Sequence, residues 1–337
     1  MNEFLKSILV GINSIIGNYG WSVVVFTLLI RLILFPFDYK SRSSMRKTQK
    51  LQPEIARLQK KYANDQEKLN RKLSELYKKE HINPISSCLP MLITLPILYA
   101  MFAAMRLVAN EQMVAQVFDM LQGKQPVLEG WLWIKNVWMP DSPFSACLPD
   151  YNSLRAITDT NIWQSAFAAL GDNVANLPEA LALTADSFTS ANLQTTIQAI
   201  YNTLETMPSY VEATSALPGW TFNLWVTTVN IMKDYNGFYI LPVMSALTQY
   251  LMTKMQPTQQ PTAADSAQQQ QAAASSNFMK WFFPLFSLWI CSGYSAMFAI
   301  YWVASNVIAA LQTLGINWYL DRKEKKTAAV AGEGSVK

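Results

Sequence analysis

Arg31 lies in the middle of residues 18–40, a stretch that is otherwise apolar enough to cross a membrane. From residue 21 to residue 37, only two hydroxyl residues, one proline and this arginine interrupt the run of apolar side chains. A guanidinium at the centre of a bilayer costs about 2.5 to 3.5 kcal/mol on insertion scales, so it is rarely left facing lipid. Other polar groups must therefore solvate it, and a charge held in this way can offset the charge of an acidic ligand.

Several apolar segments carry polar residues at helical spacing, and these are the candidate partners of Arg31. Residues three, four, seven or eleven positions apart share one face of a helix, so each set forms a polar stripe. Converging stripes would line a wet groove inside the membrane. The candidate groove residues are Thr27 and Arg31, followed by Ser245 and Gln249, and then Tyr301, Ser305, Asn306 and Gln312.

A plainer interpretation of the same residues stays open. Arg31 is about seven residues from Asp38, so its side chain can snorkel towards the cytoplasm, while hydroxyl and amide side chains hold neighbouring helices together. Because stripes on separate helices do not fix how those helices face each other, the sequence alone does not choose between the two interpretations.

Catalytic and cofactor motifs are missing from the sequence. It contains no P-loop, GxSxG or HExxH motif and no pair of intramembrane carboxylates. Its three cysteines are far apart and match neither a disulfide framework nor a zinc site. We therefore predict that the protein is not an enzyme and has no cofactor, no metal and no direct readout of nucleic acid.

Composition indicates a membrane protein with several spans. Of the 337 residues 51% are hydrophobic and only 15% are charged, and several apolar runs reach about 20 residues. The expected fold is an all-α polytopic membrane protein, a five-span bundle with a hydrophilic groove, a cytoplasmic helical hairpin and a small helical extracytoplasmic insertion.

The charge distribution predicts the orientation of the spans. Residues 38–81 hold 13 Lys and Arg against 6 Asp and Glu, whereas residues 107–235 hold 4 against 12. By the positive-inside rule the first segment is cytoplasmic and the second lies outside. The N-terminus is then outside and the C-terminus, with its basic tail, is inside.

These signals divide the chain into ten segments. The order is an amphipathic surface helix, span one, a cytoplasmic hairpin, span two, an outer loop with an insertion, span three, a flexible linker, spans four and five, and a basic tail. An ordinary packed helix remains the alternative for the first segment. The predicted bounds are 1–18, 19–40, 41–82, 83–106, 107–237, 238–255, 256–277, 278–293, 294–320 and 321–337.

The hairpin is predicted from two apolar repeats, Leu51 to Tyr62 and Leu69 to Tyr77, which are separated by a polar break. Its basic surface is either a solvated face near anionic lipid or a docking site for a ribosome or a nascent chain. The candidate contact residues are Arg57, Lys60, Lys61, Lys68, Arg71 and Lys72.

Four stretches resemble the YidC-type membrane protein insertases. They cover the spans and the hairpin: NYGWSVVVFTLLIRLILFPF, LQPEIARLQKKYANDQEKLNRKLSELYKKEHINPISSCLPMLITLPI, FYILPVMSALTQYLMTKMQP and YWVASN. The resemblance implies a five-span core around a hydrophilic groove that holds Arg31. It also implies nascent membrane proteins as clients, the Sec translocon and the lipid bilayer as partners, and the bacterial cell membrane as location.

Two departures from the resemblance concern the outside of the membrane. The chain lacks the large N-terminal periplasmic domain of Gram-negative members, and residues 145–237 enlarge the outer loop. The expected function is that of an insertase and chaperone, which passes short tails of clients through the groove and releases their hydrophobic helices into lipid, alone or with the translocon. The alternative is an assembly factor that holds helices laterally without translocation.

Overall fold

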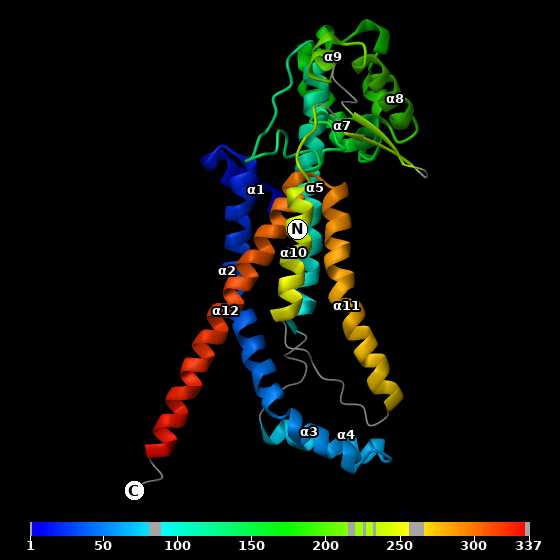
Figure 1. Ribbon diagram of the computed structural model, residues 1–337. Coiled ribbons are helices and arrows are strands. Elements are labelled where there is room, and N and C mark those ends of the chain that lie inside the picture. Colours follow the sequence, from blue (N-terminus) through cyan, green and yellow to red (C-terminus); the bar gives the residue numbers. More distant parts are fainter. Residues whose placement is uncertain are drawn as a thin grey trace. The chain divides into compact units, whose positions relative to one another are not determined.

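The computed structural model describes residues 2–80, 89–214, 220–224, 227–231, 234–255 and 266–333, and these residues are mostly helical (Figure 1). They form two compact units, which are described separately. The first unit comprises Met1–Phe26, Ala100–Met244 and Leu288–Trp302, and the second comprises Thr27–Tyr99, Ser245–Ser287 and Val303–Lys337.

The described residues include six long helices, five of which contribute residues to both units. Among the described residues two helices, α2 and α12, are long and apolar enough to cross a membrane. Their most apolar windows have mean hydropathies of 2.0 and 1.5. The other three predicted spans stay predictions. The bounds are α1 Asn2–Ile16, α2 Tyr19–Lys50, α5 Leu89–Leu121, α10 Ile240–Met255, α11 Ser266–Gly293 and α12 Ala296–Glu333.

The outer insertion of the first unit packs around aromatic side chains. Phe118 of α5 makes edge contacts with Trp163 and Phe188, whose rings stack with centroids 6.1 Å apart. All three rings are buried, so the insertion has a small hydrophobic core of its own on the end of α5. Its elements are α6 Tyr151–Arg155, α7 Thr160–Ala169, the 3-10 helices Gly171–Asn176, Glu179–Leu181 and Ala185–Phe188, α8 Leu193–Leu204 and α9 Pro208–Thr214.

A β-hairpin in the insertion corrects the prediction of an all-helical fold. Strand β1, Trp220–Leu224, pairs with the antiparallel strand β2, Thr227–Ile231, and Trp220 lies opposite Ile231. The two segments read WTFNL and TTVNI, and β-branched and aromatic residues are enriched in strands. Large and polar residues alternate along WTFNL, which is the pattern of a strand with two different faces.

The start of α10 is fixed by a buried carboxylate. Asp141 is fully buried and accepts hydrogen bonds from the main-chain N–H of Tyr239 at 3.2 Å and of Leu241 at 2.6 Å. The first N–H groups of a helix have no partner within the helix, and a carboxylate at this end also interacts favourably with the helix dipole. The Asn236 amide donates to the carbonyls of Met139 and Pro140, which closes this junction on a second side.

Gly237 is required by the same junction, because a Cβ at this position would collide with the Asp141 carboxylate. Gly237→Ala is expected to lower the free energy of unfolding of the first unit by about 1 to 3 kcal/mol, the usual cost of overpacking. Gly130→Ala is the matched control, since its added methyl group would meet only carbonyl oxygens at 3.5 and 3.7 Å. Thermal unfolding of both variants in the same detergent measures the difference, and equal stabilities would contradict the close approach.

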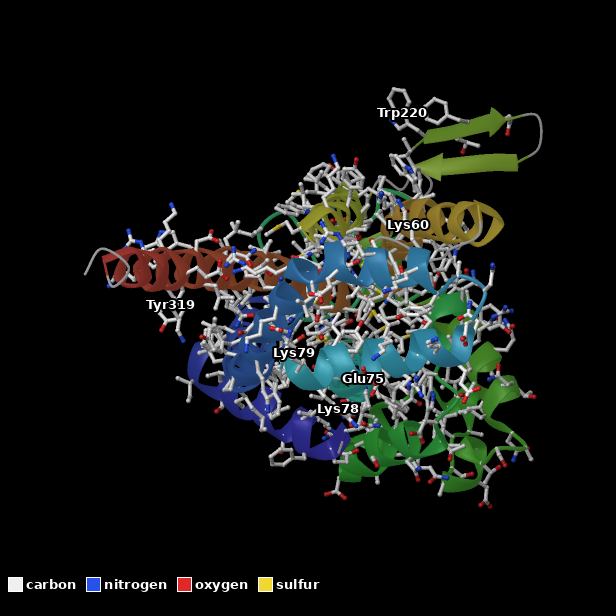
Figure 2. All side chains as sticks on the ribbon, turned by 90° about the horizontal axis from the view of Figure 1, so that it is seen from below. Lys60, Glu75, Lys78, Lys79, Trp220 and Tyr319 are labelled. Atoms are coloured by element: carbon white, nitrogen blue, oxygen red, sulfur yellow. The ribbon has the colours of Figure 1, made fainter. Side chains whose placement is uncertain are left out.

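The predicted helical hairpin is confirmed in the second unit. Helices α3, Gln52–Lys61, and α4, Gln66–Lys79, lie side by side and bury Ile55, Leu69 and Leu76 between them (Figure 2). The Asp65 side chain accepts a hydrogen bond from the Lys68 N–H at 3.0 Å and thereby caps α4. The hairpin therefore has a small apolar core and presents its charged residues outwards.

Helix bounds differ from the prediction at four places, one of which is the end of α12 at Glu333, where span five was predicted to end at residue 320. Helix α2 continues to Lys50, ten residues past the predicted end of span one, and α5 continues to Leu121. Helix α11 begins at Ser266, so residues 266–277 are helical where a flexible linker was expected. Glutamine and alanine have high helix propensity, so a polar segment that lacks a core can still extend a neighbouring helix. Predicted parts 81–88 and 256–265 lie outside the described residues.

Candidate functional site

Arg31 contacts a neutral hydroxyl group on another helix of the second unit. It is half-buried on α2, and its Nη2 donates a hydrogen bond of 2.6 Å to Oγ of Ser305 on α12. Ser305 itself is only 7% exposed. Since a hydroxyl group orients the guanidinium without neutralising it, Arg31 keeps its positive charge.

Gln312, two turns beyond Ser305 on α12, binds the main chain of Arg31. Its Nε2 donates to the carbonyl oxygen of Arg31 at 3.0 Å, so Arg31 is held both at its side chain and at its main chain. The Oε1 atom of Gln312 is buried and accepts no hydrogen bond from the described residues. A buried acceptor of this kind favours a polar neighbour such as water or a peptide N–H.

Asn306 joins α12 to α10 in a second group of hydrogen-bonded side chains. Its Nδ2 donates to Oγ1 of Thr248 and to Oε1 of Gln249, both at 3.2 Å. Thr248 in turn donates to the main-chain carbonyl of Ser245 at 3.1 Å. Because Ser305 and Asn306 are adjacent, α12 carries both groups, and we call Arg31, Thr248, Gln249, Ser305, Asn306 and Gln312 the polar seam.

Five of the eight predicted groove residues belong to these two hydrogen-bonded groups, together with Thr248, which shares the polar stripe of Ser245 and Gln249 on α10. Thr27 and Ser245 are in the same unit and are buried, with 1% and 0% exposure. Tyr301 is buried on α12, four residues before Ser305, and its predicted place in the groove stays a prediction. Its spacing of four residues from Ser305 predicts a shared helix face, and both residues are on α12.

Asp38 is an acidic neighbour of Arg31 on the same helix. Asp38, two turns further along α2, interacts electrostatically with both Arg31 and Arg42. None of the ion pairs found in the described part of the chain includes Arg31. The three side chains therefore carry a net positive charge on this part of α2, which suits an acidic ligand.

Large apolar side chains of the same helices are exposed. On α2, Ile33 is 68% exposed, and on α12, Leu311 is 63% exposed. Such surfaces are costly in water and stable against lipid or against another hydrophobic helix. Polar groups and exposed apolar groups thus occur on the same helices. The apolar set comprises Leu28, Leu29, Leu32, Ile33 and Phe35 of α2 and Val307, Leu311, Leu314 and Trp318 of α12.

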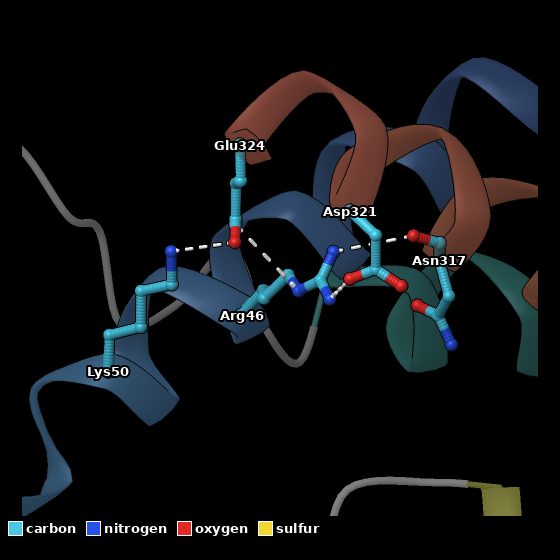
Figure 3. A network of polar contacts seen from close by, with 5 residues as sticks. All are labelled: Arg46, Lys50, Asn317, Asp321 and Glu324. Carbon is cyan, nitrogen blue, oxygen red and sulfur yellow. Dashed lines mark hydrogen bonds and ion pairs between the residues drawn. The ribbon is translucent and has the colours of Figure 1, made fainter. Parts of the chain in front are cut away.

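An ion-pair network links the end of α2 to α12 beyond the seam, and the sequence interpretation missed it. Arg46 binds Asp321 and lies 3.8 Å from Glu324, which also pairs with Lys50 at 2.9 Å (Figure 3). Arg46 also donates to the carbonyl of Asn317 at 3.4 Å. Opposite charges beyond two predicted spans were the available signal, but nothing in the sequence says which segments are neighbours.

The predicted hairpin contacts are on the surface of α3 and α4. Five of them are exposed and Lys72 is half-buried. Lys72 pairs with Glu75 at 2.6 Å, whereas Lys61 and Lys68 lie over the ring of Tyr62. Figure 2 shows Lys60 on α3 and Lys78 and Lys79 on α4. Most of this basic surface is thus open to a partner.

A cavity of about 140 Å³ lies in the first unit. It is lined by α5, by residues 138–140 and by the turn between α11 and α12, with Arg106 among its polar side chains. None of the predicted groove residues lines it. It therefore does not correspond to the predicted groove.

The sequence profile of the family described as 60Kd inner membrane protein matches residues 11–183 and 188–324. Together these two segments include all the seam residues and the hairpin. The match also extends through most of the outer insertion, which lies beyond the stretches that carried the resemblance in the sequence.

Individual relatives are similar over shorter segments. The membrane protein insertase YidC of Fusobacterium nucleatum is 42% identical over 106 residues, which is 32% of this chain and 52% of that protein. The YidC of Clostridium perfringens is 42% identical over 128 residues, 38% of this chain and 48% of the relative. The YidC of Campylobacter jejuni is 44% identical over 102 residues, 30% of this chain and 19% of the relative. The chain thus spans about half of the first two relatives and less than a fifth of the third.

Proposed function

The chain belongs to the 60 kDa inner membrane protein family, also known as the YidC/Oxa1 family, and we propose that it acts as a membrane protein insertase and chaperone. The observation that carries the proposal is the polar seam, in which a half-buried Arg31 is oriented by Ser305 and has no ion-pair partner among the described residues. Exposed apolar side chains on the same helices suit the hydrophobic segment of a client.

In the proposed mechanism, the polar tail of a client moves along the seam. Each acidic residue at the bilayer centre costs about 2.5 to 3.5 kcal/mol, and a hydrated groove shortens the dry part of the path. Arg31 offsets acidic charge, while Gln312 and Gln249 offer amide groups to the peptide backbone. The driving force is the transfer of the client's apolar helix into lipid, worth about 25 cal/mol per Å² of buried surface, so no nucleotide is required.

The proposed arrangement has five spans, with the N-terminus outside and the C-terminus in the cytoplasm of a bacterial cell. The basic hairpin then faces the cytoplasm, where it can meet anionic lipid, a nascent chain or a ribosome. Nascent membrane proteins are the proposed clients, and the Sec translocon is a proposed partner. The charge difference between residues 38–81 and residues 107–235 supports this orientation.

Reconstitution tests the proposed function directly. The purified protein in liposomes is expected to insert a small single-spanning client with a short acidic tail, so that the tail becomes protected from added protease. Protein-free liposomes and liposomes with a heat-inactivated sample are the controls. No protection above these controls would overturn the proposal.

The exposed apolar faces of α2 and α12 also suit a factor that holds helices without translocating their tails. Photocrosslinkers at Gln249 and Gln312 separate the two functions, because both side chains are half-buried and belong to the seam. Thr27 and Ser305 are more deeply buried and are less suitable positions. Crosslinks to a client's polar tail support insertion, whereas crosslinks only to its apolar helix support holding.

A further inference from the structure

The β-hairpin of the outer insertion has one aromatic face and one polar face. Trp220 and Phe222 alternate with Thr221 and Asn223 along β1, so the two pairs point to opposite sides of the hairpin. The two rings stack with centroids 6.3 Å apart and are 69% and 46% exposed. Figure 2 shows Trp220 projecting away from the strand ribbon.

On the polar face, a side-chain hydrogen bond joins the two strands. Thr228 of β2 donates to the Asn223 side chain at 3.1 Å, and the two residues lie opposite each other in the register. The segment 220–231 contains no charged residue. A hairpin of two strands alone is marginally stable in water. Contact of its exposed aromatic face with an apolar surface would stabilise it.

The hairpin is tethered closely to the start of α10. Only two residues separate Ile231 from Asp234, which is a reach of about 10 Å. Asp234 is locked in place, because Lys135 pairs with it at 2.5 Å and the Cys147 N–H donates to its carbonyl at 3.2 Å. Helix α10 begins six residues later at Ile240, in the same unit.

We propose that the hairpin rests on the extracytoplasmic surface of the cell membrane, with Trp220 and Phe222 in the lipid headgroup region and Thr221 and Asn223 facing water. The inference rests on the proposed function, which makes α10 a membrane span that begins at the outer surface. Tryptophan is enriched at this depth of a bilayer, and an uncharged hairpin carries no desolvation penalty for ionised groups. The short tether holds the hairpin at the height of that surface.

Environment-sensitive fluorophores on adjacent residues of β1 test the proposal. Phe222→Cys and Thr221→Cys place the label on opposite faces of one strand, and both side chains are exposed. Burial and the Asp234 carboxylate raise the pKa of Cys147 to about 12, so this native thiol stays protonated and labels poorly. The unsubstituted chain, labelled in parallel, gives the background to subtract.

In proteoliposomes we expect the label at residue 222 to shift its emission to shorter wavelength and to be quenched by lipids brominated close to the headgroup. The label at residue 221 should keep the emission of a water-exposed probe. Equal emission from both labels, without quenching, would overturn the proposal. A shielded label at residue 222 that brominated lipid does not quench would instead indicate a protein occupant, a client or a second copy, and would also overturn it.

Client insertion measured in the same liposomes separates this inference from the proposed function. If insertion proceeds while neither label is quenched, only the membrane contact of the hairpin is wrong. If quenching occurs at residue 222 while no client is inserted, the contact stands and the insertase function fails.

Discussion

Replacing Arg31 by alanine is expected to slow the insertion of clients with acidic tails by at least about tenfold, while clients with neutral tails are affected much less. An acidic side chain about 6 Å from the guanidinium gains about 3 kcal/mol at an effective dielectric constant of 20. Since 1.36 kcal/mol corresponds to a tenfold change in rate, losing half of this attraction produces an effect of that size. Insertion rates of two clients that differ only in tail charge measure the discrimination.

Two companion variants separate the charge of Arg31 from its hydrogen bonds. Arg31→Lys keeps the charge but loses the planar fork that reaches Ser305, so most of the preference for acidic tails should remain. Ser305→Ala keeps the guanidinium and removes its acceptor, so it is expected to lower stability without changing the preference between tails. An equal loss of rate for acidic and neutral tails in Arg31→Ala would make Arg31 a structural residue only.

The periodic parts of the fold were predictable from sequence, because a helix face can be inferred from residues that are close in the chain. The hairpin is an example: the repeats around Ile55 and Leu69 predicted two amphipathic helices, and both residues are buried in its core. The predicted break between the two repeats is also confirmed, since Asp65 lies between α3 and α4 and caps α4. These features depend on local spacing alone.

Contacts between helices were not predictable to the same degree. Arg31 and Ser305 were both candidates, but their contact joins positions 274 residues apart, and no spacing rule relates them. The pairing of Arg46 with Asp321 was missed for the same reason. A stripe defines a direction around the helix axis and says nothing of the partner helix.

In the insertion the overall composition favours helices, whereas the alternation that favours a strand is confined to a few residues. The insertion is rich in Ala, Thr and Asn, and this composition led to a prediction of short helices throughout. Within WTFNL, however, large and polar residues alternate with a period of two, which is a strand pattern. The pattern is short, and short patterns are ambiguous until the pairing strand is known.

Deleting the helical hairpin is expected to abolish insertion while the protein remains in the membrane. The structure suggests removing residues 52–79 and joining the ends with a Gly-Ser linker. This keeps Lys50, whose pairing with Glu324 belongs to the network between the end of α2 and α12. The two candidate membrane spans, α2 and α12, are untouched, so resistance to alkaline extraction should be unchanged. Tail protection in liposomes measures the loss, and unchanged activity would leave the hairpin as a solvated surface.

A charge variant then shows whether the hairpin acts through its basic surface. Replacing Arg57, Lys60, Lys61, Lys68 and Arg71 by glutamine leaves the buried core of Ile55, Leu69 and Leu76 intact. Each basic residue near an anionic surface contributes about 1 kcal/mol, so binding to anionic vesicles or ribosomes should fall steeply and lose its salt dependence. The opposite control is the double variant Glu54→Gln and Glu67→Gln, which removes acidic charge from the same hairpin. It should strengthen binding to anionic vesicles or ribosomes. The helices α3 and α4 are still folded in the charge variant and are absent from the deletion. If the charge variant inserts clients normally while the deletion does not, insertion requires the folded hairpin and not its basic charges.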